Sequence, residues 1–158
     1  MYKCTLQSNL GMTAHIDKVL AAGSSSLYAL RVLRSHGLQP AALHDVTMAT
    51  TVAHIIYASP AWWGYTSKMD RDRIDHLFRR LIRGGFLPAT TEGAAQLIAK
   101  SDDRLFQAII RDPNHVLQSL LPPTRNSGHN LRARPHIFTL PLKDDRNFMS
   151  RLLYKNTY

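Results

Sequence analysis

The chain has 158 residues, of which 44% are apolar, and its 20 lysines and arginines outnumber 11 acidic residues to give a formal net charge of +9. This composition excludes wholesale disorder, and the length suits one domain with a core of its own. No apolar run reaches the roughly 18 residues of a membrane span. The start lacks a secretory pattern, and the single Cys4 cannot form an internal disulfide. We therefore expect an intracellular protein, in the nucleus or cytoplasm, without a membrane partner.

The first two predicted elements are helices. Apolar or small residues recur every three or four positions over 13–36, and Gly37 suits the C′ position that ends a helix. The weak helix formers at 23–26 are expected to loosen or bend it. Pro40 suits the first turn of the second helix, which should run to about Ala58. Its apolar side chains point to several sides, which indicates a central, buried helix.

A tight aromatic stretch at 57–64 follows and holds both tryptophans. Trp62, Trp63 and Tyr65 offer rings on which nucleic-acid bases can stack. Such a cluster at a helix corner more often packs to fix the angle between two helices. We therefore predict a structural corner made of Tyr57, Pro60, Trp62, Trp63 and Gly64.

The third predicted helix begins after Thr66 or Ser67, either of which can cap it, and ends at Gly84-Gly85. Asp70 in its first turn favours the helix dipole. Its predicted core stripe is Ile74, Leu77, Phe78, Leu81 and Ile82. At 100° per residue, an arginine-rich side lies opposite that stripe.

The rest of the chain reads as shorter pieces. A short amphipathic helix is predicted at 91–100, and a second one opens at Ser101 or Asp102 and stops at Asp112-Pro113. A turn or two over 113–121 precedes an extended, partly flexible basic segment and a short terminal helix that packs back. The sequence thus predicts an all-α protein, a small irregular helical bundle over 1–121 followed by a basic arm with a short terminal helix over 122–158.

Neither a catalytic centre nor a metal or cofactor site is predicted. The acidic pairs Asp102-Asp103 and Asp144-Asp145 each stand where a helix is expected to start, so capping explains them better than metal binding. The eight histidines lack ligand spacing, and neither a nucleophile motif nor a phosphate loop of the Walker type is present.

The positive charge favours a polyanionic partner, nucleic acid first, because clustered cations gain by displacing counterions from phosphates. Most of the excess lies in 67–84 and 122–158. The alternatives are a solvated face balanced by Asp70, Asp72 and Asp75, and a disordered basic arm. The candidate nucleic-acid-binding residues are Lys68, Arg71, Arg73, Arg79, Arg80, Arg83, Arg132 and Arg134.

Ordered motifs carry a family resemblance. They are Tyr57-Ala-Ser-Pro-Ala-Trp-Trp-Gly64, Asp70-Arg-Asp-Arg-Ile74, Asp112-Pro-Asn-His-Val-Leu117 with Leu120-Leu-Pro-Pro123, Asn130-Leu-Arg-Ala-Arg-Pro-His136 and Arg151-Leu-Leu-Tyr154. Together they resemble the C-terminal part of reverse transcriptases from LINE-type, non-LTR retrotransposons, of the tick-transposon kind. The resemblance covers about residues 9–158.

The resemblance implies a helical thumb and C-terminal extension that contacts an RNA template and its DNA primer, downstream of a polymerase palm. The family's Tyr-x-Asp-Asp catalytic motif has no match here, so no catalytic residue is carried over. We therefore expect a non-catalytic fragment of an RNA-directed DNA polymerase that binds RNA or an RNA–DNA duplex. The competing hypothesis is a helical interaction module whose exposed Trp62-Trp63 corner docks another protein, and an enzyme that uses Asp102 or Asp103 comes third.

Overall fold

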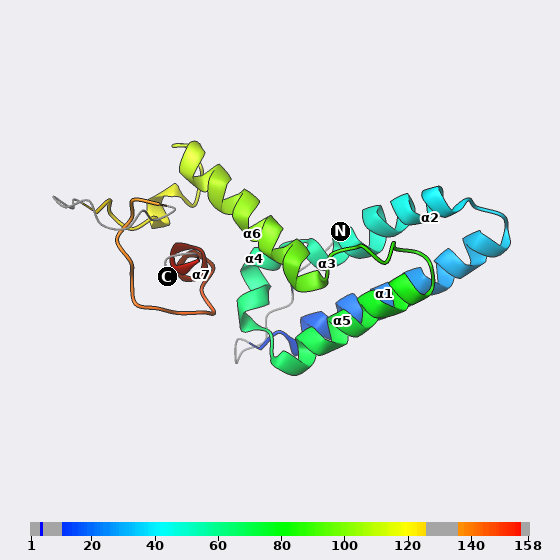
Figure 1. Ribbon diagram of the computed structural model, residues 1–158. Coiled ribbons are helices and arrows are strands. Elements are labelled where there is room, and N and C mark those ends of the chain that lie inside the picture. The colour runs from blue at the N-terminus through cyan, green and yellow to red at the C-terminus, as the bar shows by residue number, and fades with distance from the viewer. Residues whose placement is uncertain (1–3, 5–10, 126–135, 156–158) are drawn as a thin grey trace. The chain divides into compact units, whose positions relative to one another are not determined.

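The protein is all-α, which confirms the predicted fold class (Figure 1). The computed structural model describes Cys4, residues 11–125 and residues 136–155. In chain order its elements are α1 (Thr13–Ser35), α2 (Pro40–Thr47), the π-helical turn η1 (Met48–Val52), α3 (Ala53–Ile56), α4 (Ser59–Trp62), the 3-10 turn η2 (Trp63–Tyr65), α5 (Lys68–Arg83), α6 (Ala94–Arg111), the 3-10 turn η3 (Gln118–Leu120) and α7 (Phe148–Tyr154). Within these residues no helix is long and apolar enough to cross a membrane.

The chain forms two compact units that meet between Ala99 and Lys100, inside α6. From the sequence we predicted a helical domain over 1–121 and a basic arm with a short terminal helix over 122–158. The second half of α6 carries Asp102 and Phe106, which contact residues of the C-terminal segment.

In the first unit, α1 and α5 lie side by side and run in the same direction (Figure 1). Near their N-termini, the Thr13 hydroxyl donates to Asp70 at 3.2 Å. Further along, Gly23 faces Leu77, and a Cβ atom at Gly23 would collide with that side chain. The missing side chain therefore leaves room for the tip of the Leu77 side chain between the helices. The expectation that 23–26 would loosen α1 is wrong, since α1 is continuous through it.

The end of α1 follows the predicted glycine signal. Gly37 has a φ of 86°. The Gly37 N–H donates to the Arg34 carbonyl, and the Leu38 N–H donates to the Leu33 carbonyl. This pair of bonds is a Schellman ending, which satisfies carbonyls that the helix leaves unpaired.

The segment from α2 to α3 is less buried than the sequence suggested. Its buried side chains, Leu43, Thr47, Thr51, Val52 and Ile55, form one face. Ala49, Thr50 and Ala53 are exposed, and small side chains there cost little in water. The expectation of a central helix buried on several sides is therefore wrong. The Thr47 and Thr50 hydroxyls donate to carbonyls four residues back, where the helix widens into the π-turn.

The corner at 57–64 turns through a left-handed residue. Helix α3 ends at Ile56, two residues before the predicted end, because Ala58 adopts a φ of 52°. Pro60 lies in the first turn of α4, so it starts a helix as well as ending one. Trp62 is fully buried, and its indole N–H donates to the Tyr57 carbonyl at 3.0 Å. This bond ties the two sides of the corner together.

Helix α5 has the predicted cap, core and ending. The Ser67 hydroxyl accepts from the Asp70 N–H at 3.1 Å and lies 2.8 Å from its carboxylate. Ile74, Leu77, Phe78 and Leu81 are buried and Ile82 is half-buried. Gly85, with a φ of 72°, follows the last turn.

The second unit corrects three expectations. Helix α6 is continuous, so Ser101 and Asp102 lie inside it and cap nothing. The α7 cap is Asn147, which accepts from the Ser150 N–H, rather than the Asp144-Asp145 pair. The described part of the predicted arm is not simply extended. Its residues Phe138 and Leu140 pack with Phe106, Leu152 and Leu153, and Thr124 and Phe138 form an antiparallel bridge.

His136 anchors this segment through both nitrogens of its ring. Its Nδ1 accepts from the Phe138 N–H at 3.2 Å, so Nδ1 carries no proton. Its Nε2 lies 2.7 Å from the Leu153 carbonyl and donates to it. The ring therefore joins the start of the described segment to α7.

A buried ion pair holds α6 to α7. The Arg151 guanidinium donates to Asp102 Oδ2 at 2.7 Å, and both side chains are largely buried. Burial raises the pKa of Asp102, and the bond from Arg151 opposes that shift. Next to this pair, Lys155 binds Asp103 at 2.7 Å.

Changing Arg151→Met should lower the free energy of unfolding by about 3 kcal/mol, because it leaves the Asp102 carboxylate buried without a cation. The double variant Arg151→Met with Asp102→Leu should recover most of the loss, since it leaves no unpaired charge. Urea unfolding followed by circular dichroism measures both. A double variant no more stable than the single one contradicts this account of the pair.

Candidate nucleic-acid interface

The predicted cations of α5 differ in what they contact. Lys68, Arg79 and Arg83 are exposed, whereas Arg71, Arg73 and Arg80 are half-buried. The remaining two predicted cations, Arg132 and Arg134, lie outside the described residues. The structure thus places six of the eight candidates on a single helix.

Arg71 supports the corner. Its guanidinium donates to the Thr66 hydroxyl at 2.9 Å and to the Trp63 carbonyl at 3.4 Å. It also lies 4.9 Å from the centre of the Trp63 ring, a cation–π contact. These three contacts hold η2 against the start of α5, so Arg71 is a structural residue.

The tryptophan corner is a packing element. Trp62 is buried in the core, with 0% of its surface exposed, and packs edge-on against Trp63. Trp63 is half-buried beneath Arg71. The docking hypothesis needed an exposed Trp62-Trp63 pair, and that premise is wrong, because the Trp62 ring faces the core and leaves no surface for a partner or a base.

Arg73 joins α1 to α5. Its guanidinium donates to Asp17 at 2.6 Å and to Asp70 at 3.3 Å. The hydrogen bond with Asp17 raises the pKa of Arg73, which stays charged. Because two carboxylates already surround it, Arg73 contributes little net positive charge to the surface.

The remaining arginines form what we call the arginine face, which consists of Arg79, Arg80 and Arg83. None of them makes an ion pair with another residue in the described part of the chain. They occupy the last two turns of α5, where cations also stabilise the helix dipole. Asp70, Asp72 and Asp75 lie in the first half of the same helix. Helix α5 is therefore basic only toward its C-terminal end.

Helix α1 extends this basic end. Because α1 and α5 are parallel, their C-terminal turns lie together, and α1 brings Arg31 and Arg34. Arg34 donates to the Gly84 carbonyl at 2.6 Å and covers the Phe86 ring at 4.7 Å. Arg31 is exposed and has no ion pair with any described residue. Neither residue was predicted from the sequence to bind nucleic acid, because the parallel packing of α1 and α5 leaves no local signal.

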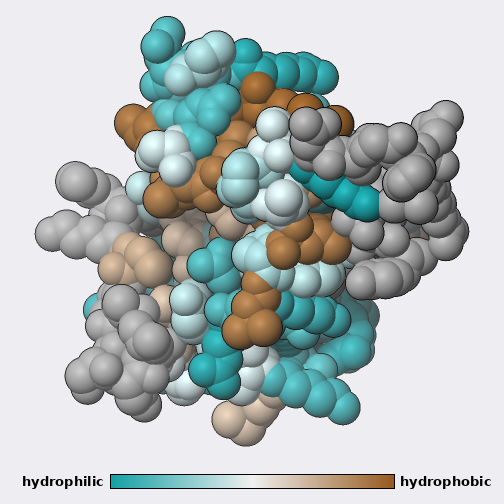
Figure 2. All heavy atoms as spheres, turned by 90° about the vertical axis from the view of Figure 1, so that its left-hand side faces the viewer, coloured by the Kyte–Doolittle hydropathy of each residue, from teal (hydrophilic) through white to brown (hydrophobic). Residues whose placement is uncertain are grey.

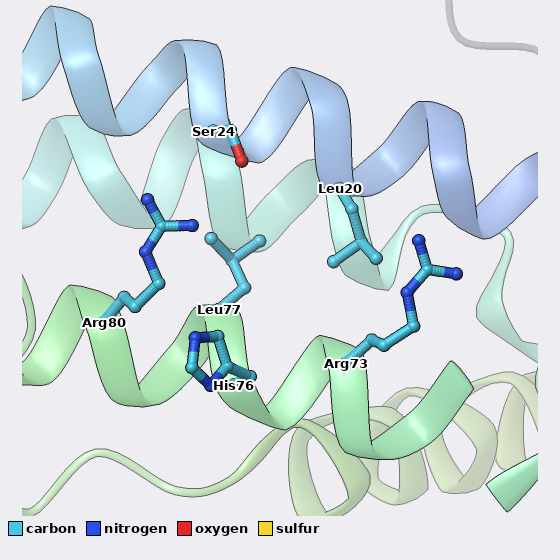
Figure 3. A pocket seen from close by; sticks show the side chains of 6 residues that line it. All are labelled: Leu20, Ser24, Arg73, His76, Leu77 and Arg80. Atoms are coloured by element: carbon cyan, nitrogen blue, oxygen red, sulfur yellow. The ribbon is translucent and has the colours of Figure 1, made fainter. Parts of the chain in front are cut away.

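A cavity of about 200 Å³ lies between α1 and α5. In Figure 3, Arg73 and Arg80 extend from α5 toward α1 on either side of Leu77, and the Ser24 hydroxyl points from α1 into the space between the helices. The six lining residues are Leu20, Ser24, Arg73, His76, Leu77 and Arg80. Of these, Arg73 and Arg80 were predicted from the sequence as binding residues and Leu77 as a core residue.

The acidic pair Asp102-Asp103 forms ion pairs within the second unit. Asp102 and Asp103 each bind a cation near α7, which accounts for the pair that the enzyme hypothesis used. In the part of the chain that the structure describes, no three His, Cys, Asp or Glu side chains are placed to hold a metal ion.

His15 is a buried histidine beside the corner. Only 6% of its surface is exposed, and neither ring nitrogen has a hydrogen-bond partner among the residues that the structure describes. Its ring packs edge-on against Trp62, with centroids 5.2 Å apart. Burial lowers the pKa of His15, and the charges of His54 and Lys18 lower it further. The ring is therefore neutral and serves as a packing residue.

Comparison with protein-family models, with curated proteins and with solved structures found no match for this chain. The retrotransposon resemblance thus rests on the ordered motifs alone.

Changing His15→Phe should raise the free energy of unfolding by about 1–2 kcal/mol at neutral pH, because it removes two buried nitrogens without partners. The gain should grow as the pH falls below about 6.5. A histidine with a lowered folded pKa binds more protons when unfolded, so acid destabilises the wild type through His15.

Thermal unfolding between about pH 5 and about pH 7 provides the measurement. The same substitution at the exposed His36 is the matched control and should leave the stability at neutral pH unchanged. If the stability gain of the His15→Phe variant does not increase at acid pH, the account of this site is wrong.

Proposed function

We propose that this chain is a non-catalytic fragment of a retrotransposon RNA-directed DNA polymerase and that it binds RNA or an RNA–DNA duplex. The ordered motifs support the origin. The observation that carries the binding role is the group of arginines without ion pairs at the C-terminal ends of α1 and α5, which are Arg31, Arg79, Arg80 and Arg83.

The chemistry of this group fits phosphates rather than bases. Guanidinium groups bind phosphate oxygens in pairs of parallel hydrogen bonds. Among the described residues around them, Phe86 is buried and Trp63 lies under Arg71, so the exposed ring is that of Tyr28, one turn before Arg31 on α1. A single ring of this kind stacks on any base. Binding should therefore depend on the backbone charge and show little sequence preference.

Apolar side chains also reach the surface, as Figure 2 shows for one face, where they are interspersed with hydrophilic ones. Exposed examples include Tyr28 in the first unit and Val116 in the second. Scattered apolar residues of this kind are ordinary on protein surfaces. We therefore do not assign a protein partner to them.

Fluorescence anisotropy with a labelled RNA–DNA duplex over a range of salt concentrations tests the binding role. The wild type should bind at low salt, and log K should fall with log salt at a slope of about −2 to −4, since two to four phosphates are neutralised. Changing Arg79→Gln and Arg83→Gln together should weaken binding at least tenfold and reduce the slope by about two.

Arg104→Gln is the matched control, because Arg104 is an exposed helical arginine in the second unit with no ion pair to a described residue. It removes one charge without touching the arginine face. Binding that cannot be detected at low salt overturns the nucleic-acid role, and equal losses in the control and the double variant remove the arginine face from it.

A further inference from the structure

The cavity between α1 and α5 has an arginine at each end, and only the arginine at one end is paired with carboxylates. At the Arg73 end, Asp17 and Asp70 already bind the guanidinium. At the Arg80 end, no described residue pairs with the guanidinium. An anion that enters the cavity is therefore drawn to the Arg80 end.

Ser24 supplies a second donor at that end. Its neighbour Ser25 donates to the Ala21 carbonyl at 3.1 Å, which is the usual bond of a serine inside a helix. The Ser24 hydroxyl makes no hydrogen bond with a described residue and points into the space between the helices (Figure 3). A hydroxyl and a guanidinium from two helices thus face one space.

The floor of the cavity is apolar and its volume is modest. Leu20 from α1 and Leu77 from α5 lie between the two arginines (Figure 3). A volume of about 200 Å³ exceeds the about 30 Å³ that one water occupies in the liquid several times over, so a hydrated phosphate group fits. The apolar floor suits the carbon atoms of a sugar attached to that phosphate.

Beyond the cavity, α1 carries two arginines on the same side as Ser24. Ser24, Arg31 and Arg34 are spaced by seven and three residues, so they share one side of α1. Arg34 reaches Gly84 at the end of α5, which shows that this side follows the boundary between the helices. Arg31 therefore lies along the same line as Ser24 and Arg80.

We propose that this cavity is a phosphodiester site, in which one backbone phosphate of a bound nucleic-acid strand takes hydrogen bonds from the Ser24 hydroxyl and the Arg80 guanidinium. The adjoining sugar lies over Leu20 and Leu77, and the strand continues toward Arg31. This inference rests on the proposed nucleic-acid role and adds to it a specific position on the α1–α5 boundary.

The test is a double-mutant cycle on duplex affinity. Ser24→Ala should weaken binding about three- to tenfold without changing the salt slope, because it removes a hydrogen bond and no charge. Arg80→Lys keeps the charge and loses the paired hydrogen bonds, so it should weaken binding with a similar slope. The two changes should be non-additive, since both groups bind the same phosphate.

Ser25→Ala is the matched control on α1, and it should leave affinity unchanged. Ser24→Ala combined with Arg83→Gln should be additive, because Arg83 does not line the cavity. Additive losses for Ser24→Ala with Arg80→Lys, or wild-type affinity in Ser24→Ala, overturn the site while leaving the nucleic-acid role intact.

A second arm separates the site from the proposed function. Inorganic phosphate is titrated into the wild type and into Ser24→Ala, and the amide signals of α1 and α5 are followed by NMR. If the duplex does not bind but phosphate binds in a Ser24-dependent way, the nucleic-acid role fails and the cavity is a site for free phosphate. If neither binds, both proposals are overturned.

Discussion

The close approach of α1 to α5 is the constraint on which the first unit depends. Gly23 offers no side chain to Leu77, and the two helices therefore pack backbone against side chain at their middle. Asp17 and Arg73 fix the same pair nearer its N-termini. Because the helices are parallel, this one contact region sets the alignment of both C-terminal ends. The cavity and the neighbouring arginines follow from that alignment.

Local signals in the sequence predicted the elements that depend on neighbouring residues. Ser67 caps α5, and Gly37 and Gly85 follow the ends of α1 and α5, because capping and left-handed endings are decided within a few positions. The same reasoning failed at Asp102. It looked like a cap, yet it lies inside α6, because Arg151, 49 residues away in the chain, balances its charge.

The candidate site shows the same division between local and distant causes. Charge placement found the arginines of α5, but it did not distinguish the structural ones from the others. Arg73 is neutralised by Asp17, 56 residues earlier, and no sequence period reveals that pair. Ser24 and Arg31 were missed for a related reason, since they join the site only through parallel packing. The structure is thus needed to tell the arginines without ion pairs from those that are already paired.

The most direct test of this account is the contact between the middles of α1 and α5. In a NOESY spectrum of the isotope-labelled protein, the account predicts cross-peaks between the α-protons of Gly23 and the methyl groups of Leu77, which lie in contact. It also predicts cross-peaks between the side chains of Asp17 and Arg73. The absence of the Gly23–Leu77 cross-peaks, or cross-peaks that pair the start of α1 with the end of α5, would contradict it.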